Sequence, residues 1–222
     1  MDLLTKGIEQ MKDEDYEGAA VSFQQAIEED PSNPDGYINF ASLLLHIDDA
    51  PRAEKLYQRA IEIDSESVAA QYGLGLLYFE QEAYQKASKQ FKEAIELGLE
   101  EADAYFMLAS SLGMQSKTSD ALPFLEKAYQ LDQEQLEYAF QYGLALAELD
   151  HIREAMEVFE DILKQDATHA DARYNLAVAF LFQEQTDQAI AELDKILELD
   201  PDFEPATDLL MHIEFLKEEM DE

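Results

Sequence analysis

The sequence predicts an all-α protein built from repeated pairs of antiparallel helices, and three observations support this prediction. Small and large apolar residues recur at a constant interval of 34 residues along nearly the whole chain. Helix-breaking segments such as 30–34, which reads Asp-Pro-Ser-Asn-Pro, and 200–202 fall between the expected helix pairs. Aliphatic and aromatic residues make up 47% of the 222 residues, which is enough to build a continuous core.

Four sequence positions carry the repeat. Small residues allow two helices to approach closely, and larger apolar residues fill the space around the crossing. The small position of the first helix holds Gly7, Ala41, Gly75, Ala109, Gly143 and Ala177. The second helix has a small position at Ala19, Ala53, Ala87, Ala121, Ala155 and Ala189. Its large position holds Phe23, Tyr57, Phe91, Leu125, Phe159 and Leu193. Its last position holds Ala26, Ala60, Ala94, Ala128, Ile162 and Ile196. No insertion or deletion interrupts this register.

The pattern resembles that of the tetratricopeptide repeat family. The clearest match lies between Val68 and Glu101, where Leu74-Gly75 is followed by Tyr78 and later by the Ala87…Phe91…Ala94 series. In general character, the chain resembles the small free-standing bacterial members of the family. The resemblance implies an all-α, right-handed superhelical α-solenoid of six helix pairs and a C-terminal capping helix. The predicted repeats are 1–33, 34–67, 68–101, 102–135, 136–169 and 170–203, with the capping helix and acidic tail at 204–222.

Each repeat is expected to hold a first helix, a short turn and a second helix. In the first repeat we expect helices over Leu3–Asp13 and Tyr16–Glu29, with the turn near Glu14-Asp15. The same alternation is expected in the other five repeats. No Gly/Ser-rich linker interrupts the chain, so we expect one continuous solenoid without a domain boundary. Pro31 and Pro201 occupy equivalent positions, but the repeats between them have no proline there. Single repeats therefore match the pattern less well, although the interval of 34 residues is unchanged.

The last segment of the chain reads as an amphipathic helix. Pro205 suits the first helical turn. The apolar stripe consists of Ala206, Leu209, Leu210, Ile213, Leu216 and Met220. One apolar face and one polar face are what a capping helix needs to cover the last repeat. The alternative is that this helix swaps into a neighbouring molecule or into the chain's own groove.

The charge and composition limit the classes of partner. The net charge of −35 repels phosphate backbones and anionic lipids, so neither nucleic acid nor a membrane is an expected partner. The same charge favours encounters with basic proteins, although it also serves plain solubility. The chain has no cysteine, no recognisable secretory signal and no apolar run long enough to span a bilayer, so we expect a cytoplasmic protein.

The resemblance also implies where a ligand binds, because the family uses a second stripe on the first helices that faces a concave groove. The apolar members of this stripe are Ile8, Ile38, Tyr72, Leu76, Phe79, Phe106, Met114, Phe140, Leu144, Tyr174 and Val178. Acids stand nearby at Asp35, Asp103, Glu137 and Asp171, and amides at Asn39, Gln141 and Asn175. This combination favours a peptide with apolar anchors and Lys or Arg side chains. The alternative for the aromatic residues is packing against the next repeat.

The motifs of catalysis and of cofactor binding are missing from the sequence. The four histidines are scattered without metal-ligand spacing, and Gly73-Leu74-Gly75 lacks the residues of a phosphate loop. Residues 13–18 resemble the start of a calcium loop, but Gln24 stands where a bidentate Glu is needed. We therefore expect no enzyme, no metal and no cofactor. Some family members clamp a C-terminal carboxylate with Lys, Arg and Asn, and no repeat of this chain supplies those cations.

These observations favour a non-catalytic adaptor or scaffold whose groove binds a hydrophobic, basic peptide or helix of a cytosolic partner. The alternative is a structural scaffold in which the groove or the C-terminal helix is used for homo-oligomerisation. The sequence does not name the partner or its conformation.

Overall fold

Thirteen α-helices make up the part of the chain that the computed structural model describes, which is residues 2–221, with side chains described for residues 2–217. No β-strand occurs within these residues. The chain divides into two compact units, Met1–Lys117 and Thr118–Glu222, and each is described by itself.

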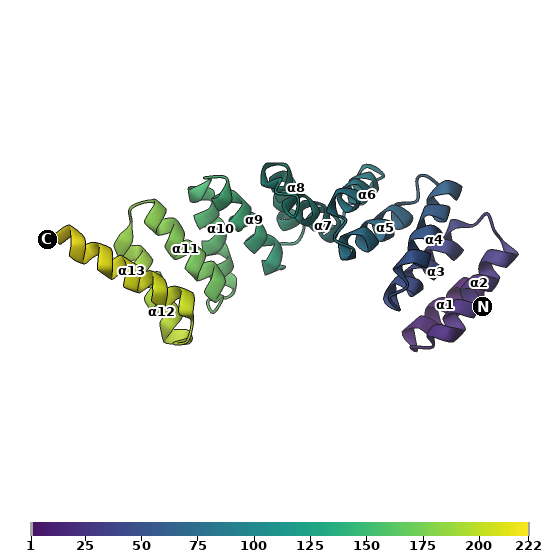
Figure 1. The fold of residues 1–222 in the computed structure, drawn as a ribbon, viewed down its shortest axis with the longest axis horizontal. Coiled ribbons are helices and arrows are strands. Elements are labelled where there is room, and N and C mark those ends of the chain that lie inside the picture. The colour runs from purple at the N-terminus through teal and green to yellow at the C-terminus, as the bar shows by residue number, and fades with distance from the viewer. Residues whose placement is uncertain (1, 222) are drawn as a thin grey trace. The chain divides into compact units, whose positions relative to one another are not determined.

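The first unit consists of three helix pairs and a seventh helix. Its helices are α1 (Leu3–Lys12), α2 (Tyr16–Glu29), α3 (Pro34–His46), α4 (Ala50–Ile63), α5 (Val68–Glu80), α6 (Tyr84–Glu96) and α7 (Ala102–Gly113). The helices α1 and α2, α3 and α4, and α5 and α6 pack as pairs, and the second helix of each pair also contacts the next first helix (Figure 1). The first pair confirms the predicted helices to within one residue.

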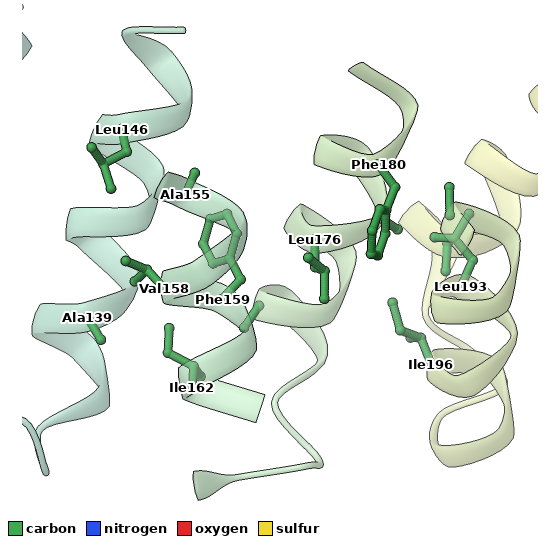
Figure 2. Close-up of a cluster of buried hydrophobic side chains, with 14 of the residues drawn as sticks. Ala139, Leu146, Ala155, Val158, Phe159, Ile162, Leu176, Phe180, Leu193 and Ile196 are labelled. Carbon is green, nitrogen blue, oxygen red and sulfur yellow. The ribbon is translucent and has the colours of Figure 1, made fainter. Parts of the chain in front are cut away.

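The second unit continues the alternation. Its helices are α8 (Thr118–Leu131), α9 (Leu136–Glu148), α10 (Ile152–Gln165), α11 (Ala170–Phe182), α12 (Thr186–Leu199) and α13 (Glu204–Asp221). One cluster of buried side chains runs from α9 to α13 and includes Phe159, Leu176 and Leu193 (Figure 2). Ala206 and Ile213 anchor α13 in this cluster, whereas Leu216 is 44% exposed, so the buried stripe of α13 ends at Ile213. The side chain of Met220 lies outside the described side chains.

The division between the units falls inside the predicted fourth repeat, with its first helix in one unit and its second helix in the other. The absence of a Gly/Ser-rich linker had predicted one continuous solenoid without a boundary. The register of 34 residues runs through this point without an insertion, so the pattern contains no signal for it. The partition into six repeats and a cap stays a prediction.

The connections between pairs repeat as regularly as the helices. The side chains of Asp30, Asp64, Asp132, Asp166 and Asp200 each accept a hydrogen bond from the backbone N–H two residues later. The hydroxyls of Ser32 and Thr168, helped by their backbone N–H groups, hold the pKa of Asp30 and of Asp166 below its ordinary value. Gly98 takes this position in the third repeat and has φ of +103°. Each connection therefore turns the chain with local hydrogen bonds or a glycine.

The turn inside each pair has a fixed backbone conformation. Six non-glycine residues, spaced 34 apart, have φ between 57° and 63°. They are Glu14, Asp48, Glu82, Ser116, Asp150 and Glu184. A side chain in this left-handed region is strained by about 1–2 kcal/mol, because Cβ crowds the following carbonyl oxygen. The packing of α1/α2, α3/α4, α5/α6, α9/α10 and α11/α12 therefore holds the turns of these pairs against a local cost.

The helix crossing in three of the pairs depends on glycine. A Cβ added to Gly75 would lie 2.7 Å from Cε1 of Phe91, and one added to Gly143 would lie 2.7 Å from Cε1 of Phe159. Gly7 meets Phe23 in the same way. In the other three repeats, alanine fills the small position and Tyr57, Leu125 or Leu193 replaces the phenylalanine. The size of the small residue and the size of the large residue are thus matched.

We predict that Glu82→Gly raises the free energy of unfolding by about 0.5–1 kcal/mol, because glycine relieves the left-handed strain but gains freedom in the unfolded chain. Urea denaturation followed by circular dichroism measures this change. Gln81→Gly is the matched control, because Gln81 has φ of −82° and gains nothing from glycine. A loss of stability in Glu82→Gly equal to that of the control would contradict the strain argument.

We also predict that Gly75→Ala destabilises the fold by about 1 kcal/mol, since overpacking against Phe91 exceeds the gain in helix propensity. Gly113→Ala, where no atom lies within 4 Å of the added Cβ, should be neutral or stabilising. In a double-mutant cycle, Phe91→Leu should recover about 1 kcal/mol in the Gly75→Ala background. Additive effects would show that the two positions are not matched.

Candidate functional site

The first helices of successive pairs contact one another directly. Such contacts join α1 to α3, α3 to α5, and α9 to α11. The Tyr72 hydroxyl also donates a hydrogen bond to the Asp103 carboxylate, which joins α5 to α7. Within each unit, the first helices therefore line one side of the stack. We call the exposed surface of these helices the first-helix face.

All the residues predicted to bind a ligand are at least partly accessible on the first-helix face. Ile8 is 38% exposed and Met114 is 59% exposed. The other nine apolar members are half-buried, the three amides are half-buried and the four acids are exposed. The first unit holds the members up to Met114, and the second unit holds those from Glu137 to Val178. None is lost to the core.

Four aromatic members lie against neighbouring rings, and one of them is Phe79, whose ring lies 5.4 Å from that of Tyr84. The rings of Tyr72 and Phe91 lie 5.5 Å apart, and those of Phe140 and Phe159 lie 6.1 Å apart. Phe140 also lies 5.2 Å from the His169 ring at the start of α11. Tyr174 similarly approaches Phe203 at 6.2 Å. The contacts of Tyr72 with Phe91 and of Phe140 with Phe159 lie within one helix pair, whereas His169 and Phe203 lie at the start of the next pair or helix, so packing against the next repeat accounts for only part of the surface of Phe140 and Tyr174.

The amides use one hydrogen-bond donor within their own helix. Asn39 Nδ2 donates to the Asp35 carbonyl and Asn175 Nδ2 to the Asp171 carbonyl, both at 2.8 Å. Gln141 Nε2 donates to the carboxylate of Glu137 at 2.9 Å. Each amide keeps its carbonyl oxygen for another donor. The sequence analysis did not anticipate these bonds, which fix the amides one turn away from the acids.

A buried ion pair in the second unit was missed by the sequence analysis. Arg173 is 9% exposed, and its Nη1 lies 2.6 Å from Oε2 of Glu192. Its Nη2 donates to the carbonyl of Ala167, whereas Nε has no partner. At the positions equivalent to Arg173 in the other repeats, at intervals of 34 residues, the sequence has Leu3, Tyr37, Gln71, Tyr105 and Ala139, none of which is charged. A lone charged residue in an otherwise uncharged column is the signal that could have found it.

Two other kinds of site were sought. Among the described residues, no group of three or more His, Asp or Glu side chains is placed to hold a metal ion. No helix in the described part of the chain has the length and apolar character needed to cross a membrane.

Helix pairs that recur at a constant interval and contact only neighbouring pairs define an α-solenoid repeat protein. Two family models, both described as tetratricopeptide repeat, match the sequence. One matches residues 10–62 and 146–211, and the other matches residues 41–95 and 72–136. The chain belongs to the tetratricopeptide repeat (TPR) family, as its sequence pattern predicted. This fold supports a scaffold for protein–protein interaction.

Solved structures agree with this assignment. A crystal structure of YrrB, described as a TPR protein with an unusual peptide-binding site, is 35% identical, with a TM-score of 0.82 over 86% of this chain and 99% of that chain. PilF of Pseudomonas aeruginosa is 19% identical, with a TM-score of 0.72 over 95% of this chain and 96% of that chain. MamA is 20% identical, with a TM-score of 0.67 over 72% of this chain and 94% of that chain. PilF and MamA share the fold only. No curated protein matched the sequence.

We predict that Tyr72→Phe lowers the free energy of unfolding by about 1 kcal/mol, because it removes a hydrogen bond to a carboxylate that joins α5 to α7. Tyr174→Phe is the control, since the Tyr174 hydroxyl makes no hydrogen bond within the described residues. Chemical denaturation of both variants measures the difference. Equal effects would show that the Tyr72–Asp103 bond does not stabilise the stack.

Proposed function

We propose that the protein is a non-catalytic adaptor whose first-helix face binds a peptide or helix of a cytosolic partner. The observation that carries this proposal is the apolar stripe on α1, α3, α5 and α7, whose members stay partly exposed instead of joining the core. Exposed apolar stripes of this kind on soluble proteins usually mark an interaction surface. The likeness to YrrB, described as having a peptide-binding site, supports the same assignment.

The proposed ligand has apolar anchors and basic side chains. Tyr72, Leu76 and Phe79 lie on one helix at spacings of three and four residues, so they line one face of α5. Each buried anchor contributes roughly 1.5–3 kcal/mol before ordering costs are subtracted. The exposed acids Asp35 and Asp103 stand on the neighbouring helices α3 and α7. Lys or Arg in the ligand would complement these acids and the net charge of −35.

Self-association is the second candidate function. It is motivated by the C-terminal helix α13, where Met211 and Phe215 are 64% and 57% exposed. These two side chains would pair with another copy more readily than with water. Light scattering over a concentration series separates the two functions. Self-association predicts that the molar mass rises with protein concentration, whereas an adaptor can stay monomeric at every concentration.

The adaptor proposal predicts that Leu76→Arg combined with Phe106→Ala weakens partner binding by at least about tenfold. Two apolar side chains of the binding surface are lost, and the new arginine repels the basic side chains of the ligand. The partner is first identified by affinity purification with mass spectrometry, and calorimetry then gives the Kd of each variant. Circular dichroism should show unchanged helix content.

Val21→Arg is the matched control for this experiment. Val21 is 56% exposed on α2, which is a second helix, so the substitution adds the same charge away from the first-helix face. The control should keep the affinity of the wild type. Unchanged affinity in the Leu76/Phe106 variant would remove the first-helix face as the binding site.

A further inference from the structure

A polar crevice in the first unit lies on the side of the second helices, away from the first-helix face. It has a volume of about 540 Å³ and is lined by residues of α4, α5 and α6. Ile61 and Leu74 supply apolar surface, and Gln58, Gln71 and Gln90 supply amides. The crevice is therefore open to a side chain with an apolar stem and a polar head.

One polar atom beside this crevice is buried without a partner among the described residues. Gln71 is 7% exposed, and its Oε1, which is closed to water, makes no hydrogen bond with them. A buried carbonyl oxygen without a donor is costly, because it has lost its hydrogen bonds to water without gaining others. The Gln71 side chain also makes no bond to the backbone of the preceding linker, whereas Tyr37, its counterpart one repeat earlier, donates to the Pro31 carbonyl at 3.2 Å. No donor among the described residues therefore bonds to Gln71 Oε1.

The second unit contains the equivalent crevice with its donor in place. That crevice is lined by α10, α11 and α12 and has a smaller volume of about 300 Å³. Three repeats of 34 residues separate Gln71 from Arg173. The same step separates Gln90 from Glu192, the acid that pairs with Arg173 at 2.6 Å. In the second unit, a guanidinium group of the chain itself therefore occupies the equivalent position.

One backbone acceptor has the same place in both crevices. Arg173 Nη2 donates to the carbonyl of Ala167, six residues earlier, and Ser65 stands at the same offset before Gln71 and lines the first crevice. The charges do not correspond, because three repeats after Glu62 and Glu93 the chain has Lys164 and Lys195. Glu62 accepts a bond from Arg59 at 2.7 Å, whereas Glu93 makes no ion pair within the described residues.

We propose that the crevice between α4, α5 and α6 binds the guanidinium group of an arginine side chain from a partner protein. The planar guanidinium has five N–H donors, which can serve Gln71 Oε1 and Glu93 together. Its aliphatic stem would cover Leu74 and Ile61. This site is separate from the first-helix face, and it selects arginine over lysine because an ammonium group lacks the planar fork of donors.

The probe for this site is the blocked tripeptide acetyl-Gly-Arg-Gly-amide, titrated into the ¹⁵N-labelled full chain. We expect the side-chain amide of Gln71 and backbone amides of α4 to α6 to shift with this peptide. The matching peptides with lysine or citrulline should produce smaller shifts, because they lack the planar fork or the charge. Equal binding of the lysine or the citrulline peptide would overturn the proposal, and so would an absence of shifts with the arginine peptide.

Two substitutions sharpen the test. Gln90→Glu installs the counterpart of Glu192 and should strengthen binding of the arginine peptide about threefold to tenfold. Gln85→Glu is its control, because it adds the same charge to α6 outside the crevice and should leave binding unchanged. An equal increase in both variants would indicate general attraction by charge, and it would contradict a built site.

Gln71→Arg should supply the missing guanidinium from within, so that peptide binding is lost and the melting temperature rises, most of all when it is combined with Gln90→Glu. Gln71→Leu keeps a side chain of similar size but removes the acceptor oxygen. It therefore tests peptide binding without burying a charge. Retention of peptide binding in either variant would overturn the proposal. Leu76→Arg, on the first-helix face, should keep the peptide shifts, so failure of the adaptor proposal and failure of this one are distinguishable.

Discussion

The close crossing of the two helices in each pair is the constraint on which the rest of the structure depends. In α1/α2, α5/α6 and α9/α10, a phenylalanine ring lies where a glycine has no side chain. Because protein interiors are close-packed, one added methyl group at this point has to be accommodated by the ring or by the helices. Repeats with alanine at the small position carry tyrosine or leucine at the large one. In two of these three repeats, those with leucine, a smaller large residue thus accompanies a larger small residue.

The turn inside each pair carries a local strain. One residue of each turn lies in the left-handed region, and this strain recurs every 34 residues without glycine. Since strain of this size persists only where the surroundings hold it, packing between the helices dominates over local preference. Within each unit, successive pairs stack so that first helices contact one another and keep their outer side chains partly exposed.

The sequence predicted the features that are the same in every repeat, such as the helices and their buried positions. It did not predict the interactions that differ from one repeat to another. Columns of small and large residues predicted the helices, because burial imposes the same choice six times. The same columns could not predict the division after Lys117, since no register change accompanies it. The predicted ligand-binding residues are accessible, but the bond between Tyr72 and Asp103 escaped prediction, because it joins residues 31 positions apart through side-chain orientation. The ion pair of Arg173 escaped for the same reason.

Differences between equivalent positions are therefore where function specific to this chain is best sought. The core columns are explained by packing alone, and packing does not require Gln71 in one repeat and Arg173 in another. In the second unit, Arg173 is paired with Glu192 and borders a smaller crevice of about 300 Å³. A shorter glutamine at the matching position leaves a larger crevice and an unpaired oxygen, in a protein whose net charge attracts basic partners. Equivalent positions thus have different roles: Arg173 forms an ion pair inside the second unit, whereas Gln71 borders the crevice proposed to bind an arginine of a partner.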